Sequence, residues 1–126
     1  MYKSGRRIRK RDIMTKQIGK ITLDLSKYPG EDFYCDGAVE DELLEIVQNY
    51  SEEEYGKVIE ERQSWPVLYH LSHIRENIVD WIPMTKDMKV LEVGSGCGAI
   101  TGALARKAGS VTCVDLSKKR STINAT

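Results

Sequence analysis

The stretch LEVGSGCGAITG, Leu91–Gly102, decides the fold of this chain because four of its twelve residues are glycine. It follows the β-branched run KVLEVG and precedes residues with helical spacing. A glycine lets the backbone turn sharply and has no Cβ atom to keep a ligand away from the main chain. The stretch therefore predicts a turn between a buried strand and a helix, at which a ligand meets the backbone.

The residues after this turn predict a second strand and a second helix. CGAITGALARKAG, residues 97–109, has helical spacing and ends in a glycine. SVTCVDL, residues 110–116, predicts a buried strand, and Ser117 caps a helix over residues 118–125. This order indicates a right-handed crossover between parallel strands. The predicted fold class is α/β, with residues 88–126 beginning a Rossmann-like, doubly wound parallel sheet.

The residues before this unit predict a helical N-terminal region. KQIGKITLDL, residues 16–25, alternates partly and predicts one short strand. A helix over about 39–50 is expected to turn its acidic residues to water, and Ser51 with Glu54 predicts a capping box for a second helix. A third helix, Trp65–Ile82, ends before a proline and carries an apolar stripe. The stripe consists of Val67, Leu71, Ile74, Ile78 and Trp81.

Composition and charge are those of an ordinary globular protein. The 126 residues fit one domain, and there is no apolar run long enough for a membrane span and no secretory signal, so we expect a cytoplasmic protein. The three cysteines form no metal or redox motif and are expected to be reduced. We interpret the basic residues 1–12 as a disordered, solvated arm rather than as a nucleic-acid contact.

The glycine turn fits two ligand-binding patterns. The first is the dinucleotide pattern G-x-G-x-x-G/A, which ends at Ala99 and expects an acidic residue about 20 positions further on, where Asp115 stands. The second is E/D-x-G-x-G-x-G, which begins at Glu92 and ends at Gly98. In this form the sequence resembles the class I S-adenosylmethionine-dependent methyltransferases, whose first motif has this pattern and whose second strand ends in an acidic residue.

The charge of Glu92 favours the second pattern. A carboxylate repels the pyrophosphate of a dinucleotide in a partly desolvated site, whereas S-adenosylmethionine carries a positive sulfonium and a positive ammonium. The resemblance implies that Glu92 lies at the methionine end of the cofactor and contacts its ammonium directly or through water. Two alternatives stay open: a nucleotide-binding module of the same fold without catalysis, and a fragment of a nicotinamide- or flavin-dependent oxidoreductase.

The resemblance also implies roles for the rest of the turn. Gly94, Gly96 and Gly98 would form the floor beneath the methionine and the ribose of S-adenosylmethionine. Ser95 and Cys97 would offer backbone contacts to the same ligand.

Two residues at the end of the second strand complete the implied cofactor site. Asp115 would accept hydrogen bonds from both ribose hydroxyls, an arrangement that suits an ionised carboxylate. Leu116 would lie against the adenine. Taken alone, Asp115 also fits a turn residue or a helix cap.

The helix before the first strand carries a second resemblance. YHLSHIRENIVDWIP, followed by the glycine stretch, is similar to methyltransferases among bacterial glycan and surface-polysaccharide enzymes, which implies a small-molecule or glycan acceptor. Arg75 is expected either at the methionine carboxylate or in an ion pair with Glu76 or Asp80. His70 and His73 complete no known ligand set, so no metal site is predicted.

The chain ends eleven residues after Asp115, before the part in which such methyltransferases usually place a base. We therefore name no catalytic residue and expect the N-terminal portion of a longer methyltransferase, inactive alone, whose unpaired sheet edge could pair with a second copy. The expected organisation is a basic arm over residues 1–12, a strand and helical lead-in over residues 13–83, and a truncated cofactor domain over residues 84–126.

Overall fold

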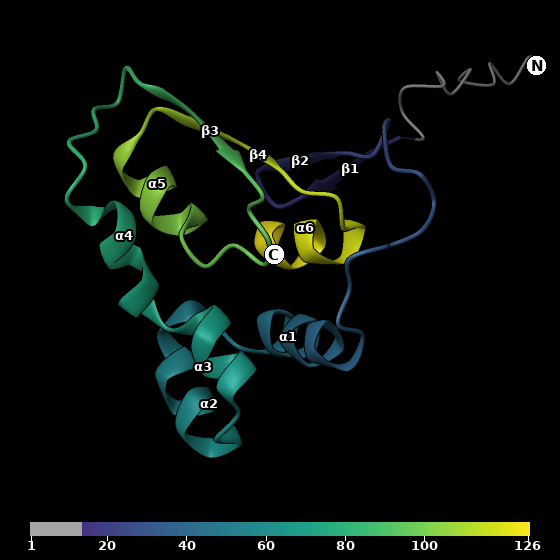
Figure 1. The fold of residues 1–126 in the computed structure, drawn as a ribbon. Coiled ribbons are helices and arrows are strands. Elements are labelled where there is room, and N and C mark those ends of the chain that lie inside the picture. Colours follow the sequence, from purple (N-terminus) through teal and green to yellow (C-terminus); the bar gives the residue numbers. More distant parts are fainter. Residues whose placement is uncertain (1–13) are drawn as a thin grey trace, which may run out of the picture.

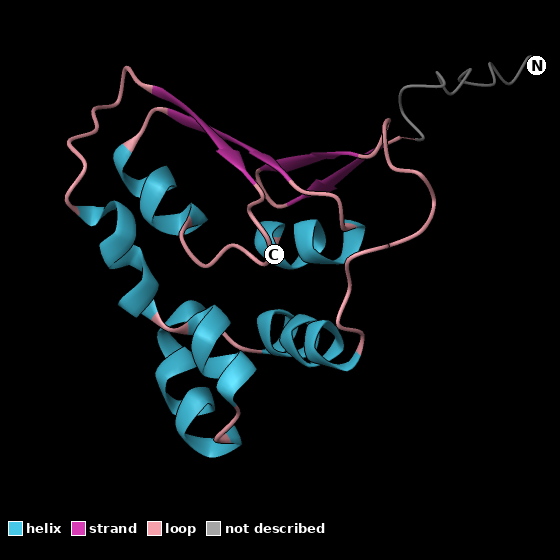
Figure 2. Ribbon diagram, viewed as in Figure 1, coloured by secondary structure: helices cyan, strands magenta, loops and turns pink. Residues whose placement is uncertain are grey.

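The computed structural model describes residues 14–126, with helices gathered on one side of two small sheets (Figure 1, Figure 2). The basic arm predicted over residues 1–12 lies outside the described residues. None of the described helices has the length and hydropathy of a membrane span. In chain order the elements are β1 Thr15–Ile18, β2 Ile21–Asp24, α1 Ala38–Asn49, the 3₁₀ turn η1 Glu52–Glu54, α2 Tyr55–Arg62, α3 Trp65–Leu71, the 3₁₀ turn η2 His73–Glu76, α4 Asn77–Asp80, β3 Lys89–Val93, α5 Thr101–Lys107, β4 Ser110–Val114 and α6 Lys118–Ala125.

A parallel pair of strands with a helix between them confirms the predicted α/β fold. β3 pairs with β4 in parallel along the whole length of both strands. Ala103 and Leu104 of α5 are buried and pack against the partly buried Val90 and Val111 of the strands. The crossover is therefore held by apolar contacts between α5 and one face of the sheet.

The helix after the glycine turn is shorter than its sequence predicts. The spacing predicts a helix from residue 97, but α5 begins at Thr101. Gly98 has a φ of 89°, in the left-handed region, so an α-helix cannot begin before it. The turn consequently occupies residues 94–100.

The N-terminal segment forms a hairpin, so the prediction of one strand is wrong. β1 and β2 pair in antiparallel register, with Ile18 opposite Ile21. Gly19, with a φ of 54°, begins the two-residue turn between them. Ile18 and Ile21 are three residues apart, so the alternation changes phase at the turn, and the prediction of one strand overlooked this change.

The first two predicted helices are confirmed. Leu43 and Ile46 of α1 are fully buried. The capping box is also present: the Ser51 amide donates to the Glu54 carboxylate over 2.8 Å, and the Glu54 amide bonds back to Ser51. The helix begins as the 3₁₀ turn η1 and continues as α2.

The third predicted helix is broken at Ser72, so the prediction of one helix over residues 65–82 is wrong. Ser72 has an extended backbone, with a ψ of 135°, and its hydroxyl accepts a hydrogen bond from the amide of Ile74. A serine hydroxyl that accepts a hydrogen bond from the backbone amide two residues later favours the start of a new helix over continuation of the preceding one. The break rotates the downstream face, so that Val79 is buried whereas Ile78 and Trp81 are exposed.

The helical region and the end of the chain share one core. Buried side chains from α1, α2, α3 and α6 form a single cluster, against which Cys97 of the glycine turn packs. Its members are Leu43, Ile46, Val58, Val67, Leu71 and Ile123. Because Ile123 lies on α6, the lead-in helices support the same helix that follows the predicted ribose-binding residue.

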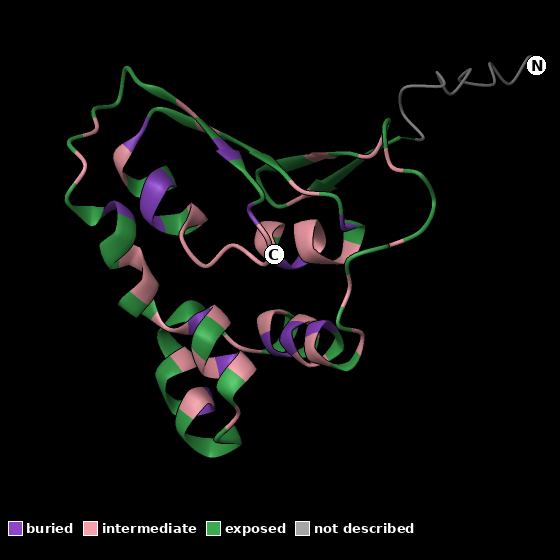
Figure 3. Ribbon diagram, viewed as in Figure 1, coloured by how far each residue is buried: buried purple, intermediate pink, exposed green. Residues whose placement is uncertain are grey.

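One face of the parallel sheet is bare in the described part of the chain. Leu91 and Val93 of β3 are 63% and 76% exposed, whereas Glu92 between them is buried. Figure 3 shows the buried residues mainly on the helices, and β4 contains no buried residue. The helices therefore cover only one side of β3 and β4.

Candidate functional site

The glycine turn has the backbone geometry that requires glycine. Gly94, Gly96 and Gly98 all have positive φ values, of 72°, 56° and 89°. The amides of Gly94 and Ser95 donate to the Val114 carbonyl over 2.7 and 3.3 Å. These bonds attach the beginning of the turn to the end of β4.

Asp115 lies beside the glycine turn. Proximity of the two is what the sequence analysis expects, because both were predicted to contact the same ligand. Its Oδ2 accepts a hydrogen bond of 2.9 Å from the Gly96 amide, and its Oδ1 accepts one of 2.9 Å from the Ser117 amide. Each carboxylate oxygen has a second lone pair, so both oxygens can still accept bonds from a ribose diol. The carboxylate is thus present where the strands end and keeps acceptor capacity for a sugar.

Glu92 is buried on the side of β3 that faces α5. The Thr101 hydroxyl donates a hydrogen bond of 2.6 Å to its Oε2, and the Cys113 thiol lies 3.4 Å from the same atom. Strand alternation places Glu92 on the same face as Val90, which packs against α5. In this position the carboxylate fixes the start of α5 to the sheet, and its contact with the cofactor ammonium stays a prediction.

The turn is open to a ligand at its beginning and closed at its end. A Cβ atom built on Gly94 or Gly96 would meet no atom within 4 Å. A Cβ atom on Gly98 would lie 2.2 Å from the Asn124 side chain of α6. The open glycines and the adjacent carboxylate fit the ribose and methionine portions of S-adenosylmethionine, which need a bare backbone and an acceptor for the sugar hydroxyls.

The remaining predicted cofactor residues differ in exposure. Ser95 is buried, and its carbonyl accepts the Gly98 amide. The Cys97 side chain packs against the helical core, which leaves only its backbone for a ligand. Leu116 is largely exposed, as an adenine contact requires before the ligand binds, and its role stays a prediction.

Arg75 and His73, which the sequence analysis considered for the methionine carboxylate and for a metal, have other partners in the structure. The Arg75 guanidinium lies 4.2 Å from the ring centre of Tyr69 and forms no ion pair with Glu76 or Asp80 among the described residues, whereas its contact with the methionine carboxylate stays a prediction. His73, Glu76 and Glu52 bring ligand atoms within 4.8 Å of one another, but Arg106 already pairs with both carboxylates. We assign no metal to this ion-pair cluster.

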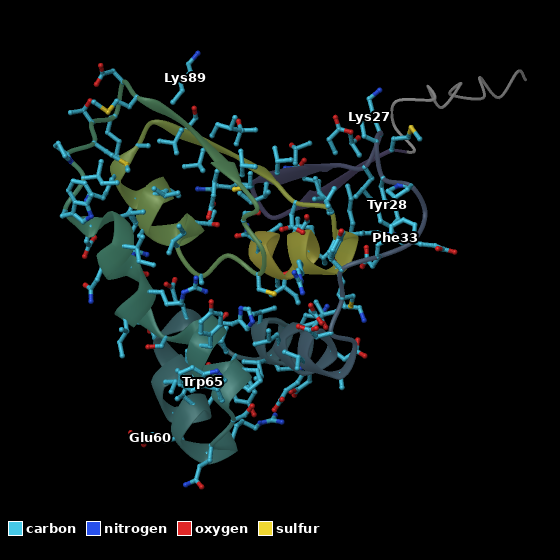
Figure 4. The ribbon with its side chains drawn as sticks, viewed as in Figure 1. Lys27, Tyr28, Phe33, Glu60, Trp65 and Lys89 are labelled. Atoms are coloured by element: carbon cyan, nitrogen blue, oxygen red, sulfur yellow. The ribbon has the colours of Figure 1, made fainter. Side chains whose placement is uncertain are left out.

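A surface hollow of about 300 Å³ lies between α2 and α3, apart from the predicted cofactor residues. Trp65 marks its position in Figure 4, on the helical side of the molecule. The hollow is lined by Ile59, Gln63, Ser64, Trp65 and Leu68. None of the residues predicted for the cofactor belongs to this lining.

Sequence reasoning missed three charged residues that hold α6. Asp32 accepts hydrogen bonds from the amides of Lys118 and Lys119 over 2.8 and 3.0 Å. Burial raises the pKa of Asp32, but these bonds outweigh it and lower the pKa below the usual value. The sequence contains no signal for this contact, because the partners are more than 80 residues apart.

The other two missed residues form a partly buried ion pair. Glu40 is only 2% exposed, although the acidic residues of its helix were expected to face water, and the Arg120 Nε donates to its Oε1 over 2.7 Å. Burial opposes ionisation, but the Arg120 bond lowers the pKa of Glu40 overall. The available signal was the spacing of Glu40 from Leu43 and Val47, which places it on the apolar face of α1.

Comparison with known families finds a match to the sequence. A family model described as "Protein-L-isoaspartate(D-aspartate) O-methyltransferase (PCMT)" matches residues 41–124, about two thirds of the chain. The match spans the helices, the glycine turn and most of α6. No curated protein and no solved structure matches the chain.

Proposed function

Because this chain belongs to the protein-L-isoaspartate(D-aspartate) O-methyltransferase family, we propose that it binds S-adenosylmethionine at the glycine turn as part of a methyl-transferring enzyme. The observation that carries the proposal is the hydrogen bond from the Gly96 amide to the Asp115 carboxylate. It brings the bare turn and the acidic strand end together at the carboxyl edge of the parallel strands, where ligands bind in such sheets.

The residues of the site supply binding and alignment. Gly94 and Gly96 leave the backbone accessible, and Asp115 offers acceptors to the ribose. When bound, S-adenosylmethionine supplies a methyl group on a positively charged sulfur. For such a transfer, alignment of the two reactants accounts for a large part of the rate enhancement.

The family description supports a protein carboxylate as the methyl acceptor. A carboxylate is ionised at neutral pH, so it attacks without first losing a proton to a base. We therefore propose an isoaspartyl-type carboxylate as the acceptor, in place of the glycan acceptor that the sequence predicts, and we name no catalytic residue.

The cysteines support the predicted cytoplasmic location. Cys35, Cys97 and Cys113 are all free. Free thiols are typical of proteins from reducing compartments. We propose the cytoplasm as the site of action on this basis.

Calorimetric titration tests the proposed ligand. We expect the chain to bind S-adenosylhomocysteine and to prefer it to NADH. Replacement of Asp115 by Asn, which keeps the side-chain shape, should weaken binding by roughly 10- to 100-fold, because hydrogen bonds to a charged group contribute about 1.5–3 kcal/mol. The matched control is Asp87→Asn, since Asp87 is exposed and lies in the turn before β3.

Two outcomes would contradict the proposal. Preference for NADH would favour the oxidoreductase alternative, and equal weakening by the two Asn variants would remove Asp115 from the site.

A further inference from the structure

A continuous series of hydrogen bonds joins the N-terminal loop to the glycine turn. Oδ2 of Asp32 accepts the Ser117 hydroxyl over 3.2 Å, and the Ser117 amide donates to Asp115 over 2.9 Å. The other oxygen of Asp115 accepts the Gly96 amide. Figure 1 shows the loop before α1 passing beside the start of α6. The ribose-binding candidate is thus only two bonds away from a loop that precedes the family match.

Asp32 supplies the acceptors that the first turn of α6 needs. A helix leaves its first amides without partners inside the helix, and a helix of eight residues is only marginally stable alone. Both carboxylate oxygens of Asp32 are used, one for Lys118 and the other for Lys119 and Ser117. Loss of this side chain would free the first turn of α6 and, with it, the Ser117 amide that orients Asp115.

Glu40 holds the same turn of α6 from the side of α1. Its bond to Arg120 is partly buried, since the Glu40 side chain is 2% and the Arg120 side chain 27% exposed, and Arg120 also lies 3.6 Å from Asp36. A buried ion pair is costly to desolvate, and apolar residues often stabilise a core as well or better. The pair therefore suits a place where the position of α6 matters more than the strength of its packing.

We propose that Asp32 and Glu40 are positioning residues of the cofactor site, which hold α6 so that the Asp115 carboxylate stays turned toward Gly96. The inference rests on the proposed function, because it assigns these residues to the binding of S-adenosylmethionine. Neither residue needs to touch the cofactor. Both lie before the range that the family model matches.

The first test removes the cap. Asp32→Ala should weaken S-adenosylhomocysteine binding by about tenfold or more, the effect of losing one hydrogen bond to a charged group. Asp32→Asn keeps one acceptor and should recover part of the affinity. The matched control is Ser51→Ala, which removes the hydroxyl of the capping box at η1, apart from the predicted cofactor residues, and should leave affinity unchanged. All affinities are compared at a temperature at which circular dichroism shows each variant to be folded.

The second test addresses the ion pair on α1. Glu40→Gln should weaken the same binding severalfold, whereas Glu45→Gln should leave it unchanged. Glu45 lies on the same helix and also pairs with an arginine, Arg62, but at the surface.

Hydrogen exchange in the absence of ligand separates positioning from general destabilisation. In Asp32→Ala the Gly96 amide should exchange faster, whereas the Tyr50 amide at the end of α1 should keep its protection. Equal acceleration of both amides, or normal affinity in Asp32→Ala, would overturn the inference and leave the proposed function standing. Failure of the unaltered chain to bind S-adenosylhomocysteine would overturn both.

Discussion

At the residue scale, the glycines of the chain differ in what they require. Gly98 has a positive φ and faces Asn124, so Gly98→Ala should cost about 2–4 kcal/mol, from left-handed strain and overpacking together. Gly96 has a positive φ but open space, so Gly96→Ala should cost only about 1–2 kcal/mol. Gly56 lies within α2 with free space around it, and Gly56→Ala should stabilise by about 0.5–1 kcal/mol.

Urea unfolding of the three alanine variants measures their free energies of unfolding and so tests the predicted order of stability. A Gly98→Ala variant as stable as Gly56→Ala would show that α6 does not pack against the turn in solution. A loss in Gly96→Ala as large as in Gly98→Ala would assign the effect to the backbone alone.

Cys97 is expected to react slowly although it lies in the glycine turn. Burial, reinforced by the Glu40 carboxylate, raises the pKa of Cys97 to about 11. At pH 8 the reactive thiolate is therefore only about one part in a thousand. Iodoacetamide followed by mass spectrometry should show Cys97 modified at least about tenfold more slowly in the folded chain than in urea. Equal rates would mean that the turn separates readily from the helical core.

The position of Glu92 illustrates what the sequence could predict of the site. Pattern and charge place a carboxylate next to the turn, and the strand alternation is visible in KVLEV. Packing determines which face of β3 contacts α5. Because Glu92 lies on that face, it accepts a hydrogen bond from Thr101. The residues that surround the turn were therefore predictable, whereas the partners of their side chains were not.

At the scale of elements, the Lys86 side chain caps the C-terminus of α5. The Lys86 ammonium donates to the carbonyls of Arg106 and Ala108 over 2.7 and 3.1 Å, at the negative end of the helix. Lys86→Met, which keeps the aliphatic stem, should lower the free energy of unfolding by about 1 kcal/mol. Lys57→Met, at an exposed pair with Glu61, should change it by less than about 0.5 kcal/mol. Chemical denaturation in low salt compares the free energies of unfolding of the two variants. Equal losses of stability would contradict a cap at the C-terminus of α5.

Elements that depend on local spacing were predictable, and those interrupted by a single residue were not. α1 and the Ser51 capping box follow from local patterns and are confirmed. The break at Ser72 interrupts an apolar stripe that continues on both sides of it, so periodicity does not reveal it. The hairpin turn at Gly19 changes the phase of an alternation that is only partial, and four-residue strands are too short for periodicity to separate them.

At the scale of the molecule, the bare sheet face is expected to associate. Leu91, Val93 and Val114 are exposed, and β3 pairs only with β4 among the described residues. An unpaired strand edge beside exposed apolar side chains is a template for pairing. Size-exclusion chromatography with light scattering should show a mass that rises with concentration, as the predicted pairing of two copies requires.

Charge on this face should abolish the association. The double variant Leu91→Lys, Val93→Lys is expected to elute as a monomer, whereas Trp65→Lys, at an exposed apolar residue of α3, should behave like the unaltered chain. A strictly monomeric unaltered chain, or an equal response to both variants, would contradict association through β3.

The sequence predicted a lead-in and a crossover but not the contacts between them. The crossover follows from residues close together in the chain, as do α1 and α2 of the lead-in. Their joint core and the bond from the Lys118 amide to Asp32 connect positions far apart in the chain, which are 86 residues apart for the bond. Local periodicity contains no information on such pairs, so the mutual support of the two regions emerges only in three dimensions.

The bonds to α6 also bear on how this protein should be shortened in practice. Family similarity begins at Asp41, which invites a gene truncated at that codon. The truncated product would lack Asp32 and Glu40, so its last helix would lose its cap and Arg120 would lose its buried counterion. The limits of sequence similarity therefore differ from those of the folded unit, and a shortened protein for crystallisation should retain Asp32 and Glu40.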